Sequence, residues 1–352
     1  MASRPVAPLR LIHARAPLRA NDIGGWTDTW FAKEGRVLNL AFAPAVEIEV
    51  KVFPNDEPTA ARVLVRAENY GETFLMDPDR PSLDPHGFLQ QTIGTFPPPV
   101  EWRVEVNIYS PVPAGISTGT SASICVALLG AFGRLVGRDV GRDEVVSLAH
   151  GVETIKLKQQ SGVQDQICAA YGGILFIEMP RYPEARVERL EVADRVREEL
   201  GRRLLLVYLG RPHSSSAIHE QVIARLESGE DPGQWRQLEA MKRLAGEARE
   251  HLLAGDLDAY GRCMADNTEC QRALFDGLVS RDADAVIELA RRHRASGWKV
   301  NGAGGQGGSL TLLAGADDLE RHKLGEALNA LGGGVRTLPL WLSPSGLTVW
   351  DV

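Results

Sequence analysis

Hydrophobic and polar residues alternate along parts of the N-terminal half, a pattern that predicts half-buried β-strands. Residues 46–52 carry Val or Ile at every second position, with Glu or Lys between them. Residues 102–108 repeat the alternation with Trp, Val, Val and Ile. The region 60–74 is expected to add a further strand.

Helical spacing of apolar residues becomes more frequent towards the C-terminus. The predicted helices are 124–135, 144–156, 164–170, 234–253, 282–295 and 318–331. Further strands are predicted at 174–178, 204–209, 309–314 and 347–352. Mixed strands and helices with few regular βαβ units indicate an α+β fold. A charged stretch near 181–196 indicates a domain junction, so we expect domains at residues 1–195 and 196–352.

Composition narrows the class of protein. The 352 residues are 44% hydrophobic and 24% charged, which is ordinary for a soluble globular protein. A net charge of −7 argues against broad binding to nucleic acid or to an anionic membrane. The four cysteines form no C-x-x-C pair, so neither a zinc ribbon nor a disulfide scaffold is indicated. No apolar run is long enough for a signal peptide or a membrane span, and we expect a cytoplasmic protein.

The segment Pro111–Ser123 concentrates small and hydroxylated residues between a predicted strand and a predicted helix. Free backbone N–H groups and the helix dipole at such a helix N-terminus attract anions. Glycines allow close approach of the backbone, and hydroxyls bind phosphate oxygens or Mg²⁺. The segment therefore predicts a phosphate-binding loop, although a simple helix cap is the alternative. It is not a Walker A loop, because no Gly-Lys-Ser/Thr triplet closes it.

A second glycine-rich loop, Gly302–Gly308, contains G-x-G-x-x-G. The dinucleotide-binding fingerprint requires a strand before this pattern and a helix after it. Here a helix is predicted before the loop and a strand after it, so we reject a nicotinamide or flavin site. A tight connection between packed elements and a wall of an active site remain as alternatives.

Four charged residues lie in unusual settings. Arg19 and Asp28 flank a Gly-Gly pair, Glu153 lies in a predicted helix, and Asp165 precedes an apolar run. Taken singly, Asp28 could cap a helix at 29–34, Asp165 could be a favourable first-turn acid, and Glu153 could be solvated. Together with the loop they supply a phosphate cradle, a metal ligand, an acid and a cation, which are the requirements of phosphoryl transfer.

These segments resemble the GHMP small-molecule kinases, the group that contains galactokinase, homoserine kinase and mevalonate kinase. The similar motifs, in the family's order, are Arg19–Asp28, Pro113–Ser123, Val163–Gly173 and Lys299–Ser309. Within this family the chain is most similar to the sugar-kinase branch, the D-glycero-D-manno-heptose kinases and L-fucokinases.

The resemblance implies two α+β domains with ATP and substrate bound between them. The N-terminal domain would be ribosomal protein S5 domain 2-like and the C-terminal domain a ferredoxin-like α/β domain. The implied reaction is the ATP- and Mg²⁺-dependent phosphorylation of a sugar, at the anomeric hydroxyl of a heptose 7-phosphate or of a fucose-like sugar. A kinase for a non-sugar alcohol and a non-catalytic ligand-sensing relative are the alternatives. A heptose 7-phosphate would require a basic pocket, for which Arg181, Lys158 and Arg211 are candidates, although solvated surface is their simpler interpretation.

The resemblance also implies a role for each site residue. Asp165 accepts or orients the hydroxyl proton, and Arg19 stabilises charge on the transferred group. Mg²⁺ is held by Ser121 and Glu153, with Thr120 as the alternative hydroxyl. The residues expected to bind ATP are Pro113, Gly115, Ser117, Thr118, Gly119, Thr120, Ser121 and Ala122. Those expected to bind the substrate are Asp28, Gly25, Trp26, Gly304 and Gly305. The expected partner is a small-molecule sugar or sugar phosphate, without nucleic acid or membrane, and the oligomeric state is not predicted.

Overall fold

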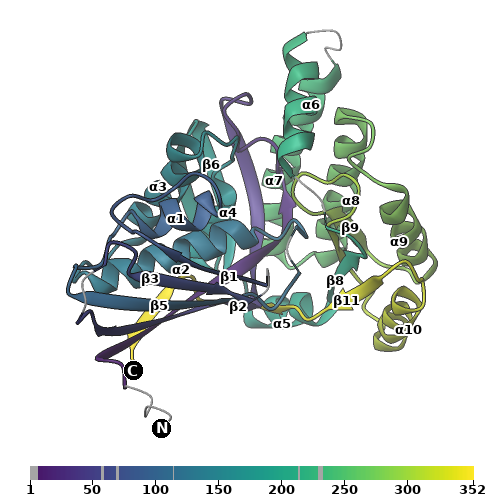
Figure 1. Cartoon of the computed structure of the whole chain (residues 1–352). Coiled ribbons are helices and arrows are strands. Elements are labelled where there is room, and N and C mark those ends of the chain that lie inside the picture. Colours follow the sequence, from purple (N-terminus) through teal and green to yellow (C-terminus); the bar gives the residue numbers. More distant parts are fainter. Residues whose placement is uncertain (1–6, 57–58, 69–70, 114, 213–214, 229–232) are drawn as a thin grey trace.

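The computed structural model describes residues 7–352 except 57–58, 69–70, 114, 213–214 and 229–232. A large, mostly antiparallel sheet organises the N-terminal lobe (Figure 1). Its main strands, in spatial order, are β13 (Thr348–Asp351), β1 (Arg10–Ile23), β2 (Gly35–Pro54), β5 (Trp102–Tyr109), β3 (Val63–Ala67) and β4 (Glu72–Met76). The first part of the long strand β2 also pairs with β6 (Ile174–Arg181), which continues to β7 (Glu184–Arg189).

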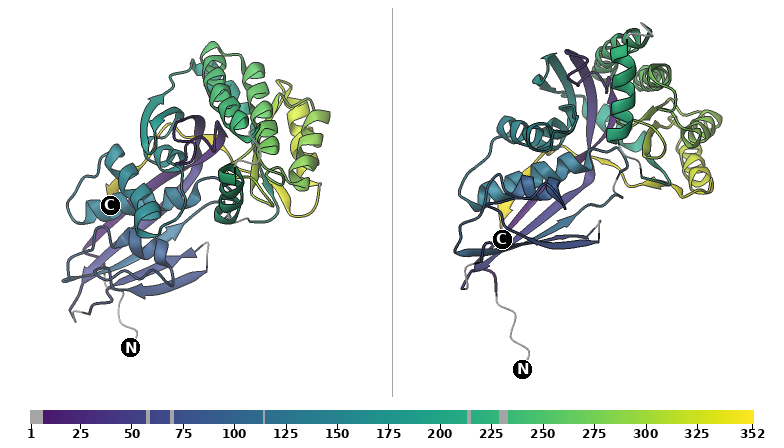
Figure 2. Two further views of the ribbon diagram at one scale, coloured as in Figure 1. Left: turned by 90° about the horizontal axis from the view of Figure 1, so that it is seen from above. Right: turned by 45° about the horizontal axis from the view of Figure 1, so that its top comes forward.

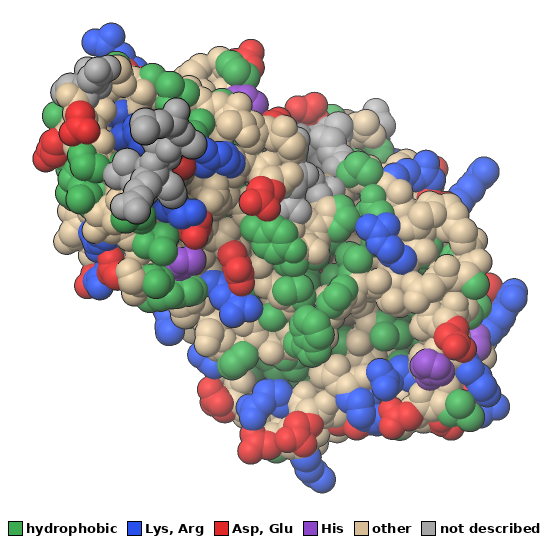
Figure 3. Space-filling model, turned by 60° about the horizontal axis from the view of Figure 1, so that its bottom comes forward, with side chains coloured by type: hydrophobic (Ala, Val, Ile, Leu, Met, Phe, Trp, Pro, Cys, Tyr) green, Lys and Arg blue, Asp and Glu red, His purple; other side chains and the backbone are tan. Residues whose placement is uncertain are grey.

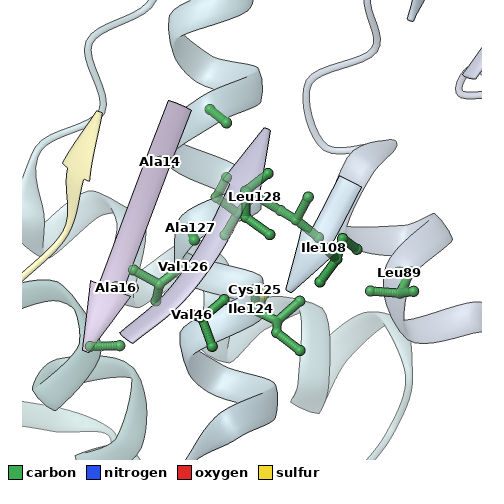
Figure 4. Close-up of a cluster of buried hydrophobic side chains, with 14 of the residues drawn as sticks. Ala14, Ala16, Val46, Leu89, Ile108, Ile124, Cys125, Val126, Ala127 and Leu128 are labelled. Carbon is green, nitrogen blue, oxygen red and sulfur yellow. The ribbon is translucent and has the colours of Figure 1, made fainter. Parts of the chain in front are cut away.

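Helices cover one face of this sheet. They are α1 (Gly87–Ile93), α2 (Thr120–Leu135), α3 (Arg142–Gly151) and α4 (Gln164–Tyr171). The central helix α2 is almost entirely buried, and Figure 4 shows how its side chains meet the small residues Ala14 and Ala16 of β1. Small residues on β1 allow this close contact, which sets α2 and the loop before it against β1.

A second, four-stranded sheet organises the C-terminal lobe. Its order is β11 (Val335–Leu338), β8 (Leu204–Leu209), β10 (Ser309–Leu313) and β9 (Gly297–Val300), all antiparallel. The chain runs from β8 through helices to β9 and β10, then through one helix to β11, which is the β-α-β-β-α-β connection of ferredoxin-like domains.

Helices lie on both faces of the smaller sheet (Figures 1 and 2). On one face Leu310 and Leu312 pack against α9 (Arg281–Arg292) and α10 (Asp318–Asn329). The other face carries α5 (Asp194–Arg203), α7 (Gly233–Ala254) and α8 (Leu257–Leu274). The helix α6 (Ser215–Ser228) projects from this lobe beside the N-terminal lobe. Because Ile23, Leu38 and Leu40 of β1 and β2 share a buried cluster with α7 and α8, the two lobes are joined by a continuous apolar contact.

The last residues of the chain return to the N-terminal lobe. Strand β12 (Trp341–Leu342) pairs with β2, and β13 pairs with β1. The division into domains at 195/196 stays a prediction; the structure adds that the sheet of the first lobe contains two strands from the end of the chain.

Most predicted elements appear with shifted ends, and three segments differ. The region 60–74 forms two strands, β3 and β4, rather than one. The helix expected at 144–156 ends at Gly151 and continues as a π-helical turn, Val152–Lys156. Residues 29–34 form turns instead of a helix, so the expectation that Asp28 caps a helix there is wrong.

Charges of both signs are interspersed on the surface. On the face in Figure 3, Lys and Arg side chains stand beside Asp and Glu, consistent with exposed pairs such as Arg10–Asp351. In the described part of the chain, no helix is both long and apolar enough to cross a membrane.

The returning segment allows a test of how the chain end contributes to stability. A Cβ on Gly346 would lie 2.1 Å from the carbonyl oxygen of Ala170 at the end of α4. We expect Gly346→Ala to lower the free energy of unfolding by about 1–3 kcal/mol, the range for overpacking, as measured by urea denaturation. The matched variant Gly246→Ala in α7, where a Cβ meets nothing within 4 Å, should raise it by about 0.4–1 kcal/mol. Equal stabilities would show that the chain end does not dock as described.

Candidate active site

A cavity of about 380 Å³ lies where the two lobes meet. β1 and the turns after it contribute Arg19, Asp22, Trp26 and Asp28. Residues 115–122 before and at the start of α2 form a second wall, and residues between 153 and 166 form a third. His219 of α6 and Gly302 and Ala303 after β9 complete the lining from the C-terminal lobe.

The loop before α2 presents a helix N-terminus to this cavity. Gly119 is the N-cap residue of α2, with φ at 67°, and as a glycine it offers no side-chain cap. An alanine Cβ there would lie 3.1 Å from Cγ of Asp165, so glycine keeps the acid and the loop close together. Because the first N–H groups of a helix have no partner within the helix, this end of α2 is suited to hold an anion.

Backbone contacts from both lobes fix the shape of this loop. The N–H of Arg19 donates to Thr118 O at 2.9 Å, and its Nη1 donates to Ser117 O at 3.0 Å. From the C-terminal lobe, the Ser309 hydroxyl donates to Ile116 O at 2.6 Å. The loop is therefore held in place by its own chain before any ligand binds.

Arg19 and Asp165 form a bidentate pair at the loop. Nε and Nη2 of Arg19 donate to the two carboxylate oxygens of Asp165 at 2.8 and 3.2 Å. Burial opposes charge on Arg19, but the carboxylates of Asp165 and Asp22 outweigh burial and raise its pKa. The Arg19 side chain is 4% exposed and that of Asp165 is 30% exposed, so the acid is the member of the pair that a ligand can reach.

Asp22 forms a buried ionic cluster that the sequence analysis missed. Its fully buried carboxylate lies 3.2 Å from Nη1 of Arg19 and 3.4 Å from Nζ of Lys299. Both of its oxygens accept from the N–H of Gly302, at 3.0 and 3.1 Å. Burial alone would raise the pKa of Asp22, but Arg19, Lys299 and this N–H lower it. For Lys299 burial dominates and lowers the pKa to about 8.

A break in β1 brings Arg19 and Asp22 together. In a regular strand, residues three positions apart point to opposite faces. The register of β1 against β2 shifts between Ala20 and Ile23, and Asn21 has a positive φ of 54°. Such a bulge redirects side chains. The signal available in the sequence was an aspartate three positions after Arg19 and directly before the Ile-Gly-Gly segment.

Asp28 caps a helix far away in the sequence. Its Oδ2 accepts from the N–H groups of Val163 and Gln164, at 3.0 and 3.1 Å, at the start of α4. Its Oδ1 accepts from Nε2 of Gln164 at 3.3 Å. Burial raises the pKa of Asp28 to about 6 in spite of these bonds. Gly162 permits this contact, because a Cβ there would lie 2.1 Å from Oδ2.

Glu153 and Ser121 are the residues of the cavity most suited to a cation. Glu153 lies in the π-helical turn and is buried; it accepts from Nε2 of Gln166 at 2.6 Å and from the Ser161 hydroxyl. Burial raises the pKa of Glu153 to about 7, and a nearby cation would favour its charged form. Ser121 is exposed, whereas the hydroxyl of Thr120 lies 3.2 Å from that of Thr118 in a buried position.

The donor set matches Mg²⁺ better than a cation that needs a full protein cage. No group of three or more His, Cys, Asp or Glu that could hold a metal ion occurs among the described residues. Mg²⁺ is commonly bound through one or two protein oxygens together with substrate phosphates and water. Ser121 and Glu153 therefore fit a Mg²⁺ ion that arrives with a phosphate ligand.

The cavity gathers most of the predicted site residues but not all. Trp26 lines it and meets His219 edge to face, with ring centroids 4.9 Å apart. Pro113, Gly25, Gly304 and Gly305 lie outside the lining. Lining residues that the sequence analysis did not single out are Asp22, Thr29, Gln159, Gln160, Gln164, Gln166 and His219.

The three glycines outside the lining serve close packing. A Cβ on Gly25 would lie 2.4 Å from Oδ2 of Asp22, and one on Gly304 would lie 2.3 Å from Leu278 O. A Cβ on Gly305 would lie 2.0 Å from Cδ1 of Ile218. Their expected contact with substrate stays a prediction.

The second glycine-rich loop combines both alternatives left open by its sequence. Gly302 and Ala303 line the cavity, whereas Gly304 and Gly305 pack against α6 and the segment before α9. The loop connects strands β9 and β10. No helix follows the glycines, which agrees with the rejection of a dinucleotide fingerprint.

Comparison with known proteins identifies similar sequences and similar folds. Residues 87–173 match the model of the GHMP kinases N terminal domain. The chain is 28% identical to a mevalonate kinase of Pyrococcus horikoshii, over 65% of this chain and 64% of that protein. It is 24% identical to a D-glycero-alpha-D-manno-heptose 7-phosphate kinase of Campylobacter jejuni, over 70% of each chain. A bifunctional fucokinase/GDP-fucose pyrophosphorylase of Arabidopsis thaliana is 24% identical over 87% of this chain and 30% of that protein.

Solved structures share the whole fold. A D-glycero-D-manno-heptose 1-phosphate kinase from Bacteroides thetaiotaomicron superposes with a TM-score of 0.74 at 19% identity, covering 97% of this chain and 99% of that chain. A galactokinase of Lactococcus lactis complexed with galactose gives 0.72 at 14% identity, covering 96% and 95%. The segment 87–173 is similar to the N-terminal domain of GHMP kinases, and the predicted two-part α+β fold is confirmed.

The buried cluster generates a prediction about stability. Asp22→Asn keeps the shape of the side chain but removes the carboxylate beside the buried Lys299 and one of the two carboxylates beside Arg19. We expect it to lower the free energy of unfolding by about 3–5 kcal/mol, the cost of breaking a buried ion pair, as measured by urea denaturation. The further change Lys299→Met should recover part of that loss.

The control is an exposed pair. Glu184→Gln removes the partner of Arg181 at the surface and should change stability by less than about 1 kcal/mol. If Asp22→Asn costs no more than Glu184→Gln, the cluster does not stabilise the fold.

Proposed function

We propose that this protein is an ATP- and Mg²⁺-dependent kinase that transfers the γ-phosphoryl group to a hydroxyl of a sugar. One observation carries the proposal: the N-terminus of α2 and its glycine loop lie directly beside the Arg19–Asp165 pair at the cavity. A cradle for phosphates and an acid within reach of an acceptor hydroxyl are what phosphoryl transfer requires.

Each residue has a role that its contacts support. Backbone N–H groups of residues 117–121 and the dipole of α2 would hold the phosphates. Asp165 would orient the acceptor hydroxyl and take its proton. Arg19, fixed by Asp22 and Ser117 O, would hold Asp165 in place and stabilise negative charge beside it.

Ser121 and Glu153 would hold Mg²⁺, which offsets negative charge on the phosphates. Burial raises the pKa of Glu153 to about 7, so the metal-free carboxyl is readily protonated near neutral pH and a bound cation would stabilise its charged form.

A sugar is favoured as acceptor by the chemistry of the lining. Trp26 supplies an aromatic surface, and Asp28 supplies a carboxylate able to accept hydrogen bonds from hydroxyls. The similarity to heptose-phosphate kinase and fucokinase points the same way. The similarity to mevalonate kinases keeps a non-sugar alcohol as the second candidate.

A non-catalytic ligand-sensing role is disfavoured, because a protein that only binds a ligand would not need Arg19, Glu153 and Asp165 at the same cavity. Phosphorylation at the anomeric hydroxyl stays a prediction.

The acid provides the most direct test. We expect Asp165→Asn to reduce kcat for ADP release with an accepted sugar by about 10²–10⁴-fold, the usual contribution of a positioned acid or base. ATP binding, measured by calorimetry, should persist, because the loop N–H groups are unchanged.

Asp282→Asn is the matched control. Asp282 also pairs with an arginine, Arg211, but lies outside the cavity lining, so turnover should be unchanged. Near-normal turnover in Asp165→Asn would remove this residue from the mechanism.

The two loop hydroxyls can be distinguished by the Mg²⁺ requirement. Ser121→Ala should raise the Mg²⁺ concentration for half-maximal rate at fixed ATP, because its exposed hydroxyl is the one that can reach a ligand. Thr120→Val should affect this concentration less, since its hydroxyl pairs with Thr118 in a buried position. The reverse order would assign the metal to Thr120.

A further inference from the structure

Acidic side chains outnumber basic ones around the cavity. Four carboxylates line it: Asp22, Asp28, Glu153 and Asp165. Among the described lining residues, Arg19 is the only Lys or Arg.

The charge of Arg19 is already compensated within the protein. Nε and Nη2 donate to Asp165, and Nη1 donates to Ser117 O and lies 3.2 Å from Asp22. With Lys299 beside Asp22, the cluster contains two positive and two negative groups. Asp28 and Glu153 are left as additional acids, and the described lining offers no further Lys or Arg to an anionic acceptor.

The N-termini of α2 and α4 at the cavity are also assigned to other groups. The proposed function assigns the open N-terminus of α2 to the phosphates of ATP. The N-terminus of α4 is closed by Asp28, whose Oδ2 accepts from Val163 and Gln164. The chain's own carboxylate thus occupies the second position where a phosphate or carboxylate of the acceptor would otherwise bind.

The basic residues that could have formed a pocket for a phosphorylated acceptor lie elsewhere. Arg181 pairs with Glu184 and Arg211 pairs with Asp282, both on the surface. Lys158 is exposed, and like the two arginines it is not part of the cavity lining.

The remaining acceptor side of the cavity is polar but uncharged. Thr29, Gln159 and Ser161 offer hydroxyls and an amide, which both donate and accept hydrogen bonds. Trp26 and His219 offer aromatic surface beside them. Hydroxyl groups on a compact carbon skeleton match this lining.

We propose that the acceptor is an electrically neutral sugar or polyol, and that sugar phosphates and carboxylated alcohols such as mevalonate are rejected. This inference rests on the proposed kinase function. An anionic acceptor would place its charge beside Asp28 without a compensating cation, and like-charge contacts of this kind disfavour a partner strongly.

The experiment compares matched neutral and anionic acceptors at saturating Mg²⁺ and ATP, with ADP release as readout. The probes are L-fucose, D-mannose, D-galactose, D-glycero-D-manno-heptose and glycerol as neutral acceptors, and mannose 6-phosphate, galactose 6-phosphate, heptose 7-phosphate and mevalonate as anionic ones. We expect kcat/KM for the best neutral acceptor to exceed that for the best anionic acceptor by about 100-fold or more, the ratio that corresponds to several kcal/mol of like-charge repulsion.

A variant that adds the missing cation tests the cause. Gln160 is exposed at the edge of the cavity and has no role in the proposed catalysis. Gln160→Lys should reduce the preference for the neutral acceptor by about tenfold, in line with one new charge contact. Gln160→Met, of similar length and without charge, should leave the preference unchanged.

The outcomes separate the two proposals. An anionic acceptor that is used as well as or better than every neutral one overturns the neutral-acceptor inference and leaves the kinase function standing. ATP binding without ADP release for any acceptor overturns the kinase function and this inference with it. An unchanged preference in Gln160→Lys shows that charge is not what selects the acceptor.

Discussion

The burial of Asp22 between Arg19 and Lys299 is the interaction on which the site depends. A carboxylate without exposure to water is tolerated because two cations and the N–H of Gly302 surround it. These partners come from β1, β9 and the loop after β9, so the cluster joins both lobes at one point. Arg19, fixed in this way, aligns Asp165 through two hydrogen bonds and holds the phosphate loop through Ser117 O.

Two helix N-termini open onto the same cavity and differ in their caps. The N-cap residue of α2 is a glycine and offers no side-chain cap, whereas Asp28 accepts a hydrogen bond from the backbone at the start of α4. Backbone dipoles alone would make both attractive to anions. Asp28, which the turns after β1 bring to α4, makes one end of the cavity unfavourable for phosphate, while the N-terminus of α2 stays favourable.

Much of this arrangement was accessible from the sequence. The strand–loop–helix pattern around 102–135 predicted the phosphate loop, because alternation and helical spacing report local structure directly. Arg19, Glu153 and Asp165 could be selected because charged residues stood beside glycines or apolar runs. The role of Asp22 could not, since it depends on a bulge in β1 and on Lys299, which lies far away along the chain. Capping of a neighbouring helix was the alternative considered for Asp28; in the structure Asp28 caps α4 instead, because capping depends on proximity in space. The motif predicted that Gly304 and Gly305 bind the substrate, whereas in the structure they lie against Leu278 and Ile218.

The pairing of β13 with β1 has a consequence for the kinetics of folding. Ile12 of β1 pairs with Asp351 of β13, so nearly the whole described chain lies between two strands that are neighbours in the sheet. Contacts between residues far apart in the sequence form slowly, because a long loop of chain must be closed before the contact is gained. Until β13 docks, β1 presents an unpaired edge, the kind of surface on which partly folded chains associate wrongly.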